Sequence, residues 1–70
     1  MASRPYPSFL IYVDQAGEFR WKLQASNYKT IADSREGYNN LADCEHAIGL
    51  VKQASGYAIW ETKDVINRRR

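Results

Sequence analysis

Apolar and polar residues alternate without a break between residues 18 and 25. A period of two is typical of a β-strand that buries one face and leaves the other in water, whereas a helix would scatter the same apolar residues around its circumference. We therefore predict a half-buried strand here, and we expect the rest of the chain to cover its apolar face. That face holds Phe19, Trp21, Leu23 and Ala25, and the polar face holds Glu18, Arg20, Lys22 and Gln24.

Two further strands are predicted on either side of this one. Residues 8–13 are apolar on both faces, which suits a strand inside a sheet better than an exposed edge. The next four residues, 14–17, begin with Asp and end with Gly, so we expect a type I turn and an antiparallel hairpin. A turn at residues 26–29, with Asn27 in the left-handed conformation, leads to a short outer strand at residues 30–33.

Helical spacing begins after a polar loop at residues 34–40. Apolar residues recur three and four positions apart over residues 41–55, which predicts a single helix with Asn40 as its N-cap. Gly56 is expected to end this helix as its C′ residue. Residues 57–62 are aromatic and β-branched, which predicts a fourth strand. The order β-β-β-α-β indicates an α+β fold in which one helix covers one face of an antiparallel sheet.

The length of 70 residues indicates one small domain, which we place at residues 8–62 between a flexible leader (1–7) and a basic tail (63–70). Domains this small bury little surface and often need a disulfide, a metal or a partner subunit. The single cysteine excludes an intramolecular disulfide, and one cysteine with one histidine cannot form a four-ligand zinc site. We therefore expect self-association to supply the missing burial.

The net charge of +2 is unevenly placed, because three of the ten basic residues end the chain. Residues 1–67 carry seven basic and eight acidic residues, which is a net charge of −1. The body is therefore not a basic nucleic-acid surface, and only the tail has that character. The longest apolar run, residues 9–13, is far short of the ~20 residues that span a bilayer. A free thiol without an export signal favours the cytoplasm, and we expect no membrane partner.

Several stretches together resemble the YegP-like family, a small bacterial and archaeal domain of unknown function. The resemblance covers about residues 9–55, although Asn27-Tyr28 replaces the family's Asn-Gly turn and Asn39-Asn40 replaces its Ser-Ser. It implies a β3-α-β unit that works in pairs, as two repeats or two subunits, with a shared sheet and exchanged C-terminal strands. It implies no activity, cofactor or catalytic residue. The stretches are Phe9–Tyr12, Asp14–Ala25, Glu36–Tyr38 and Ile48–Lys52.

Three groups of residues are candidates for contact with a partner or ligand. The first is a dimer interface on the predicted last strand, the second is a ligand or partner contact near the polar strand face, and the third is a nucleic-acid contact in the tail. Each group also has a structural interpretation: a core strand, a bend beside a solvated sheet face, and a solubilising tail. The groups are Tyr57, Ile59 and Trp60; Tyr38, Arg20 and Lys22; and Arg68, Arg69 and Arg70.

No catalytic, cofactor-binding or metal-binding constellation is visible in the sequence. Cys44 lies on the apolar stripe of the predicted helix and is expected to be a small buried hydrophobic residue. His46 lies about 200° farther around the same helix, so it cannot serve Cys44 as a base. Our hypothesis is a non-enzymatic homodimeric module that exchanges its last strand. The alternatives are weak nucleic-acid association through the tail and exposed aromatic residues, and a small-ligand or peptide-binding module.

Overall fold

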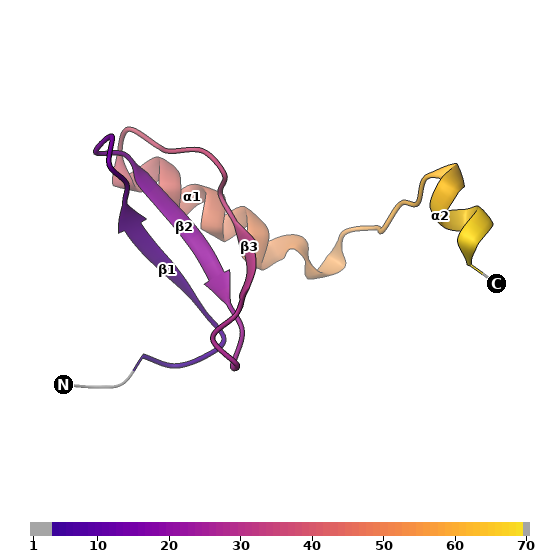
Figure 1. The fold of residues 1–70 in the computed structure, drawn as a ribbon. Helices are drawn as coiled ribbons and strands as arrows, with labels where there is room; N and C mark the ends of the chain where they lie inside the picture. Colours follow the sequence, from indigo (N-terminus) through magenta and orange to yellow (C-terminus); the bar gives the residue numbers. More distant parts are fainter. Residues whose placement is uncertain (1–3, 70) are drawn as a thin grey trace.

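A computed structural model describes residues 4–69 and confirms the α+β fold (Figure 1). Three strands, β1 (Ser8–Val13), β2 (Phe19–Gln24) and β3 (Thr30–Asp33), form an antiparallel sheet with β2 in the centre. Helix α1 (Leu41–Lys52) lies across one face of the sheet, and none of the described helices covers the other face. The sheet therefore has one face packed on a helix and one open face.

The core lies between β2 and α1, as the alternating pattern predicts. The strand register places Ile11 opposite Trp21, and Phe9 meets Trp21 edge-on with 5.6 Å between the ring centroids. Trp21 is 6% exposed, and Cys44 on the facing side of α1 is completely buried. These two are the fully buried apolar residues of the described chain, and Phe19 and Leu23 are half-buried, so the core is small.

The first turn is confirmed and the second differs from expectation. Gly17 has a positive φ of 83°, and its N–H donates to the Asp14 carbonyl over 3.0 Å. In the second turn the left-handed residue is Tyr28, with a φ of 68°, and not Asn27. The Asn27 side-chain carbonyl accepts the Lys29 N–H over 3.2 Å and so replaces a backbone turn bond. The bend then falls on Tyr28.

Helix α1 begins as predicted and ends earlier. The Asn40 side chain accepts the Asp43 N–H over 3.0 Å and confirms the N-cap. The helix ends at Lys52, and a tighter turn, η1 (Gln53–Gly56), follows it. Gly56 is therefore part of this turn and not the C′ residue of the helix. The end of the helix is capped by Gln53, whose N–H donates to the Gly49 carbonyl.

The predicted fourth strand has no partner among residues 4–69, the part of the chain that the structure describes. Residues 57–62 do not pair with β1, β2 or β3, and they lead into a second helix, α2 (Lys63–Arg68), within the predicted basic tail. Glu61, which precedes this helix, and Arg69, which follows it, form an ion pair. Figure 1 shows residues 57–69, here called the C-terminal arm, extending away from the sheet past β3. A strand exists only by pairing, so an unpaired β-type sequence stays a single ribbon.

The described part of the leader contacts the sheet. The Arg4 guanidinium donates to the Ser8 hydroxyl over 2.8 Å and to the Gln24 side-chain carbonyl over 2.7 Å. The Tyr6 ring meets the Tyr28 ring edge-on at 4.8 Å. The side chains of Arg4 and Tyr6 therefore have partners on β1, on β2 and in the turn before β3, and the flexibility of the leader stays a prediction.

Candidate functional site

The open face of the sheet carries the predicted polar contacts Arg20 and Lys22. The register pairs Tyr12 with Arg20 and Leu10 with Lys22, so these four side chains share one face. The Lys22 ammonium lies 5.5 Å from the centre of the Tyr12 ring, within the range of a cation–π contact. Basic, aromatic and aliphatic groups therefore stand next to one another in the centre of this face.

Arg20 is held in place by a partner that the sequence analysis did not identify. Its Nε donates to the Asp14 Oδ2 over 2.5 Å, and its Nη1 donates to the Arg35 carbonyl over 3.0 Å. The other Asp14 oxygen accepts the N–H groups of Ala16 and Glu18. The hydrogen bond from Arg20, followed by the one from the Glu18 amide, lowers the pKa of Asp14 below its usual value of 3.8. The sequence could have indicated this pair, because the predicted hairpin places residues 14 and 20 diagonally across from each other on the same face of the sheet.

A shallow hollow of about 420 Å³ lies beside this ion pair. Its charged lining groups are already bonded to one another, and the Asp14 carboxylate also organises the hairpin turn. A carboxylate with a lowered pKa that accepts three hydrogen bonds is a poor general base at neutral pH. The hollow therefore has the chemistry of a structural turn. Its lining consists of Tyr12, Asp14, Gln15, Ala16 and Arg20.

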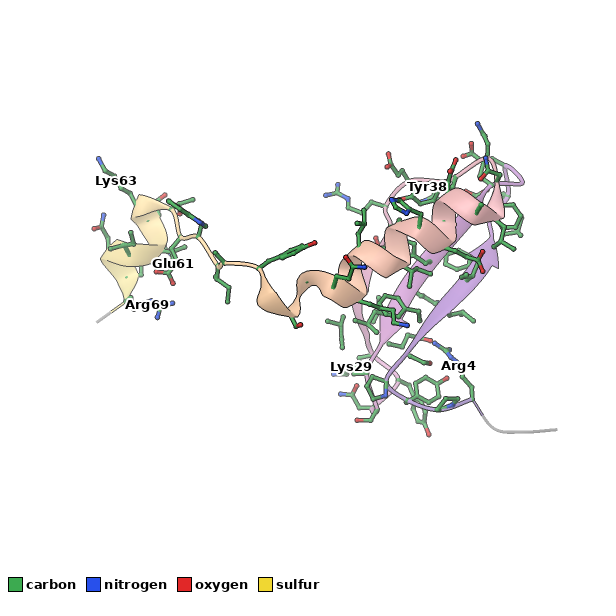
Figure 2. All side chains as sticks on the ribbon, turned by 180° about the vertical axis from the view of Figure 1, so that it is seen from behind. Arg4, Lys29, Tyr38, Glu61, Lys63 and Arg69 are labelled. Carbon is green, nitrogen blue, oxygen red and sulfur yellow. The ribbon has the colours of Figure 1, made fainter. Side chains whose placement is uncertain are left out.

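Tyr38 does not join Arg20 and Lys22. It forms an antiparallel bridge with Phe19, in which each N–H donates to the other's carbonyl over 2.8–2.9 Å. Opposite residues in an antiparallel pair share a face, so Tyr38 lies on the helix side of the sheet with Phe19, and Figure 2 shows it next to α1. Any ligand contact by Arg20 or Lys22 would therefore lie on the open face, beside the hollow, and would not include Tyr38.

Gly37 explains the Glu-Gly-Tyr sequence at this position. A Cβ at Gly37 would lie 2.5 Å from the Glu18 Oε1 and 2.6 Å from the Glu18 Cβ. A side chain other than hydrogen would therefore collide with the residue that precedes β2. The close approach lets Tyr38 reach Phe19 and form the bridge.

Among the large apolar side chains of the described chain, those with the highest exposed fraction lie on the C-terminal arm. Ile59 and Trp60 are each 91% exposed, and Tyr57 precedes them on the same extended segment. Arg68 is the last residue of α2, and Arg69 pairs with Glu61 (Figure 2). The third predicted nucleic-acid contact, Arg70, lies outside the described residues. Nucleic-acid binding by the tail stays a prediction.

Reactive groups are scarce in the described chain. Burial, with a smaller contribution from Glu45, raises the pKa of the Cys44 thiol. A smaller fraction of this side chain is therefore the nucleophilic thiolate at neutral pH. His46 is exposed on the outer side of α1. Within residues 4–69, no group of three or more His, Cys, Asp or Glu side chains is arranged to hold a metal ion. None of the helices in the same range has the length and apolar content needed to cross a bilayer.

Comparison with known proteins places this arrangement in a family. The model of a domain of unknown function, DUF1508, matches residues 14–59, which include the hairpin turn, β2, β3, α1 and the first part of the arm. This chain belongs to the DUF1508 family. The resemblance to YegP-like proteins is thereby confirmed, because the same family includes the UPF0339 proteins that the chain matches.

Individual relatives support the assignment to the DUF1508 family. A UPF0339 protein of Neisseria meningitidis serogroup B is 45% identical over 47 residues, which are 67% of this chain and 82% of that protein. A UPF0339 protein of Agrobacterium fabrum is 46% identical over 50 residues, covering 71% and 79% of the two chains. The solution structure of a protein from Haloferax volcanii superposes with a TM-score of 0.70 at 34% identity, over 79% of this chain and 93% of that one. The α+β fold of this chain is therefore shared with a solved structure.

Proposed function

We propose that this DUF1508 domain is a non-enzymatic homodimeric module whose two copies assemble by exchanging their C-terminal arms. The observation that carries the proposal is the 91% exposure of both Ile59 and Trp60 on an extended segment with no strand partner among the described residues of its own chain. Each such side chain favours burial by about 1.5–3 kcal/mol or more. An exposed aromatic and aliphatic ribbon is therefore typical of an interaction surface.

The overall size of the single chain supports a second copy. A compact domain of 70 residues has a radius of gyration of about 11 Å, whereas this chain has 15.4 Å. A folded monomer of 8.1 kDa exposes roughly 4,500 Å² of surface, whereas this chain exposes 6133 Å². The difference, about 1,600 Å² for one chain, is about twice the roughly 800 Å² that each partner buries in a standard protein interface. Docking of the arm on a partner would bring both quantities toward those of a compact protein.

The chemistry of the described residues supports a role without catalysis. The carboxylate at the open hollow is committed to Arg20 and to the turn, and the thiol of Cys44 is buried with a raised pKa. An enzyme needs a nucleophile, acid or base that can reach a substrate. A module that assembles needs only complementary surfaces, and the arm offers one.

A longer relative has the length that a covalent pair of such units would need. The UPF0339 protein encoded 5′ of a ptx operon in Stutzerimonas stutzeri matches 46 residues of this chain, and these make up 40% of that protein. Its length is therefore about 115 residues, which is enough for two copies of the unit. Two copies in one chain would be the covalent equivalent of two subunits, so a pair is the arrangement that we propose for the single-copy form.

Sedimentation velocity of the full chain at micromolar concentration tests the proposal. We expect a dimer, and we expect Trp60→Ala to lower both the dimer fraction and the melting temperature, because an exchanged strand belongs to the interface and to the fold. Ile31→Ala is the matched control, since it truncates an exposed apolar residue on β3, outside the arm, and should leave the dimer intact. A folded monomer for the wild-type chain at this concentration would overturn the proposal.

A further inference from the structure

Acidic and basic residues occupy different stretches of the chain before the arm. All six acidic residues among the first 56 residues lie within two stretches, 14–20 and 33–45. Two other stretches, 4–13 and 21–32, carry three basic residues and no acidic one. A net charge summed along the sequence therefore does not describe the surface. The acidic residues are Asp14, Glu18, Asp33, Glu36, Asp43 and Glu45, and the three basic residues are Arg4, Lys22 and Lys29.

The strand register turns this separation into two different ends of the sheet. The pair Ser8–Gln24 ends the hairpin on the side away from its turn. Figure 2 shows Arg4 and Lys29 at this end of the sheet and Tyr38 at the other. The six-residue strands separate the two ends by about 17 Å, which is more than a Debye length at physiological salt. A ligand at the basic end is therefore largely screened from the acidic end.

No carboxylate neutralises the two cations of this basic end. Two ion pairs occur within the described chain, and they lie elsewhere, at the hairpin turn and in the arm. The Arg4 guanidinium donates only to uncharged oxygens, which belong to Tyr6, Ser8 and Gln24. Lys29 is exposed on the turn before β3. Both positive charges are therefore available to an anionic ligand.

Two tyrosine rings form a fixed pair at the same end. The Tyr28 ring meets the Tyr6 ring edge-on at 4.8 Å, and the Arg4 guanidinium lies 4.6 Å from the centre of the Tyr6 ring. Gln24 joins the two segments, because its side-chain carbonyl accepts from Arg4 and its side-chain N–H donates to the Tyr28 carbonyl over 3.2 Å. Tyr28 is nevertheless 68% exposed. Its ring is thus held in place with most of its surface in water.

The backbone of Tyr28 has a conformation that favours glycine. Its φ of 68° is left-handed, and bulky side chains are rarely found there. Glycine would form the same turn without a steric cost. The tyrosine is therefore unfavourable for the turn itself, and its exposed ring points to a role outside the turn.

We propose that this basic end of the sheet binds single-stranded nucleic acid, with a base stacked on the Tyr28 ring and phosphates contacted by Arg4 and Lys29. Surfaces that bind single strands combine cations that follow the backbone with aromatic rings that stack on bases. A duplex keeps the faces of its bases covered, and an acidic peptide would match only the cations, so the exposed ring favours an unpaired strand. The site lies outside the arm and adds a function to the proposed dimer.

Fluorescence anisotropy of a labelled oligonucleotide of about twelve thymidines, titrated with the full chain, tests the proposal. We expect a dissociation constant of about 10⁻⁴ M or below at about 50 mM salt, and no binding under these conditions would overturn the proposal. Two phosphate contacts predict a slope of about −1.4 for log K against log salt. Lys22 is not counted, because Asp33 lies opposite it in the register. Lys29→Ala should roughly halve the slope, whereas Lys52→Ala, which removes an exposed cation of α1, should leave it unchanged.

Tyr28→Gly separates the role of the ring from the stability of the fold. Glycine adopts a positive φ readily, so the melting temperature should remain close to that of the wild type. The dissociation constant for the oligonucleotide should rise at least about fivefold, which is the lower end of the loss for one stacked base. Binding as tight as that of the wild type would overturn the proposal.

Three other outcomes would also overturn it. They are equal affinity for a duplex of the same length, binding that is lost in Arg68→Ala but not in Tyr28→Gly, and binding to phosphatidylserine vesicles in place of the oligonucleotide. Sedimentation velocity keeps this inference distinct from the proposed function. A monomer that binds the oligonucleotide refutes the proposed function alone, and a dimer that does not bind it refutes this inference alone.

Discussion

The substitution Gly37→Ala is a direct test of how the Glu-Gly-Tyr loop packs on β2. The added methyl group would lie 2.5 Å from the Glu18 Oε1, 2.6 Å from its Cβ and 3.0 Å from its Cδ. The carboxylate can rotate away, but the Cβ is fixed to the backbone that enters β2. The loop must therefore move, and it carries the two hydrogen bonds between Tyr38 and Phe19.

The expected loss of stability follows from the size of this clash. Inserting a methyl group into a closely packed site costs about 1–3 kcal/mol, and each kcal/mol lowers the melting temperature of a domain this small by roughly 4–8 °C. We expect a loss of about 2 kcal/mol and a decrease of roughly 8–16 °C. Gly49→Ala is the matched control: its methyl group has no neighbour within 4 Å in the middle of α1, so it should stabilise by about 0.5–1 kcal/mol.

Both variants are compared with the wild type by thermal and urea unfolding at one fixed protein concentration. The concentration is held constant because the stability of a dimer depends on it. The two Gly→Ala changes should then shift the midpoint in opposite directions. A Gly37→Ala protein as stable as the wild type would show that Glu18 does not constrain this loop and would refute the steric explanation.

Three further outcomes are expected from single substitutions or labels. The pKa of Asp14 is lower in the folded protein than its usual value of 3.8, so the ionised carboxylate stabilises the fold at pH values above 3.8, and this contribution is lost as the pH falls below that value. The variant Asp14→Asn should therefore show a smaller decline of melting temperature than the wild type between about pH 4 and pH 2. An acid decline as steep as that of the wild type would contradict this. The Cys44 thiol, which is completely buried, should react with a thiol reagent at least about 100-fold faster in unfolding urea than in buffer, and equal rates would mean that α1 opens freely. Trp60→Ala, if the ring is buried at the dimer interface, should cost about 3–5 kcal/mol per arm, and because a dimer has two arms it should raise the dissociation constant by a factor of about 10⁴ or more, as sedimentation equilibrium can measure; a change of less than about fivefold would leave Trp60 outside the interface.

The elements with a strong local period could be predicted from the sequence. The alternation around Trp21, the Asp14–Gly17 turn and the Asn40 cap all appear in the structure, because each depends on residues a few positions apart. The exceptions lie where local signals compete or where a distant residue decides. The Asn27 side chain accepts a hydrogen bond within the turn, and Tyr28 is the residue that adopts the positive φ. Residues 63–68 formed a short helix that the polar composition did not suggest.

The candidate site depended more on contacts distant in sequence. Arg20 and Lys22 lie on one face, as their spacing in β2 predicts. Tyr38 lies on the other face, because its bridge to Phe19 is set by the path of the loop after β3. The partnership of Arg20 with Asp14 also needed the hairpin register, although the two residues are only six positions apart.

The amino-acid sequence alone determined the hairpin, the helix and the buried face of β2, because periodicity and turn residues act over a few positions. It also excluded an intramolecular disulfide and a four-ligand zinc site, because the chain has one cysteine and one histidine. Only the tertiary structure decided that residues 57–62 pair with none of the described strands of their own chain and that β1 lies at an edge of the sheet. The physical reason is that a strand's backbone groups are satisfied by whichever strand lies beside it. That neighbour is set by the arrangement of the chain in space and not by the residues of the strand itself.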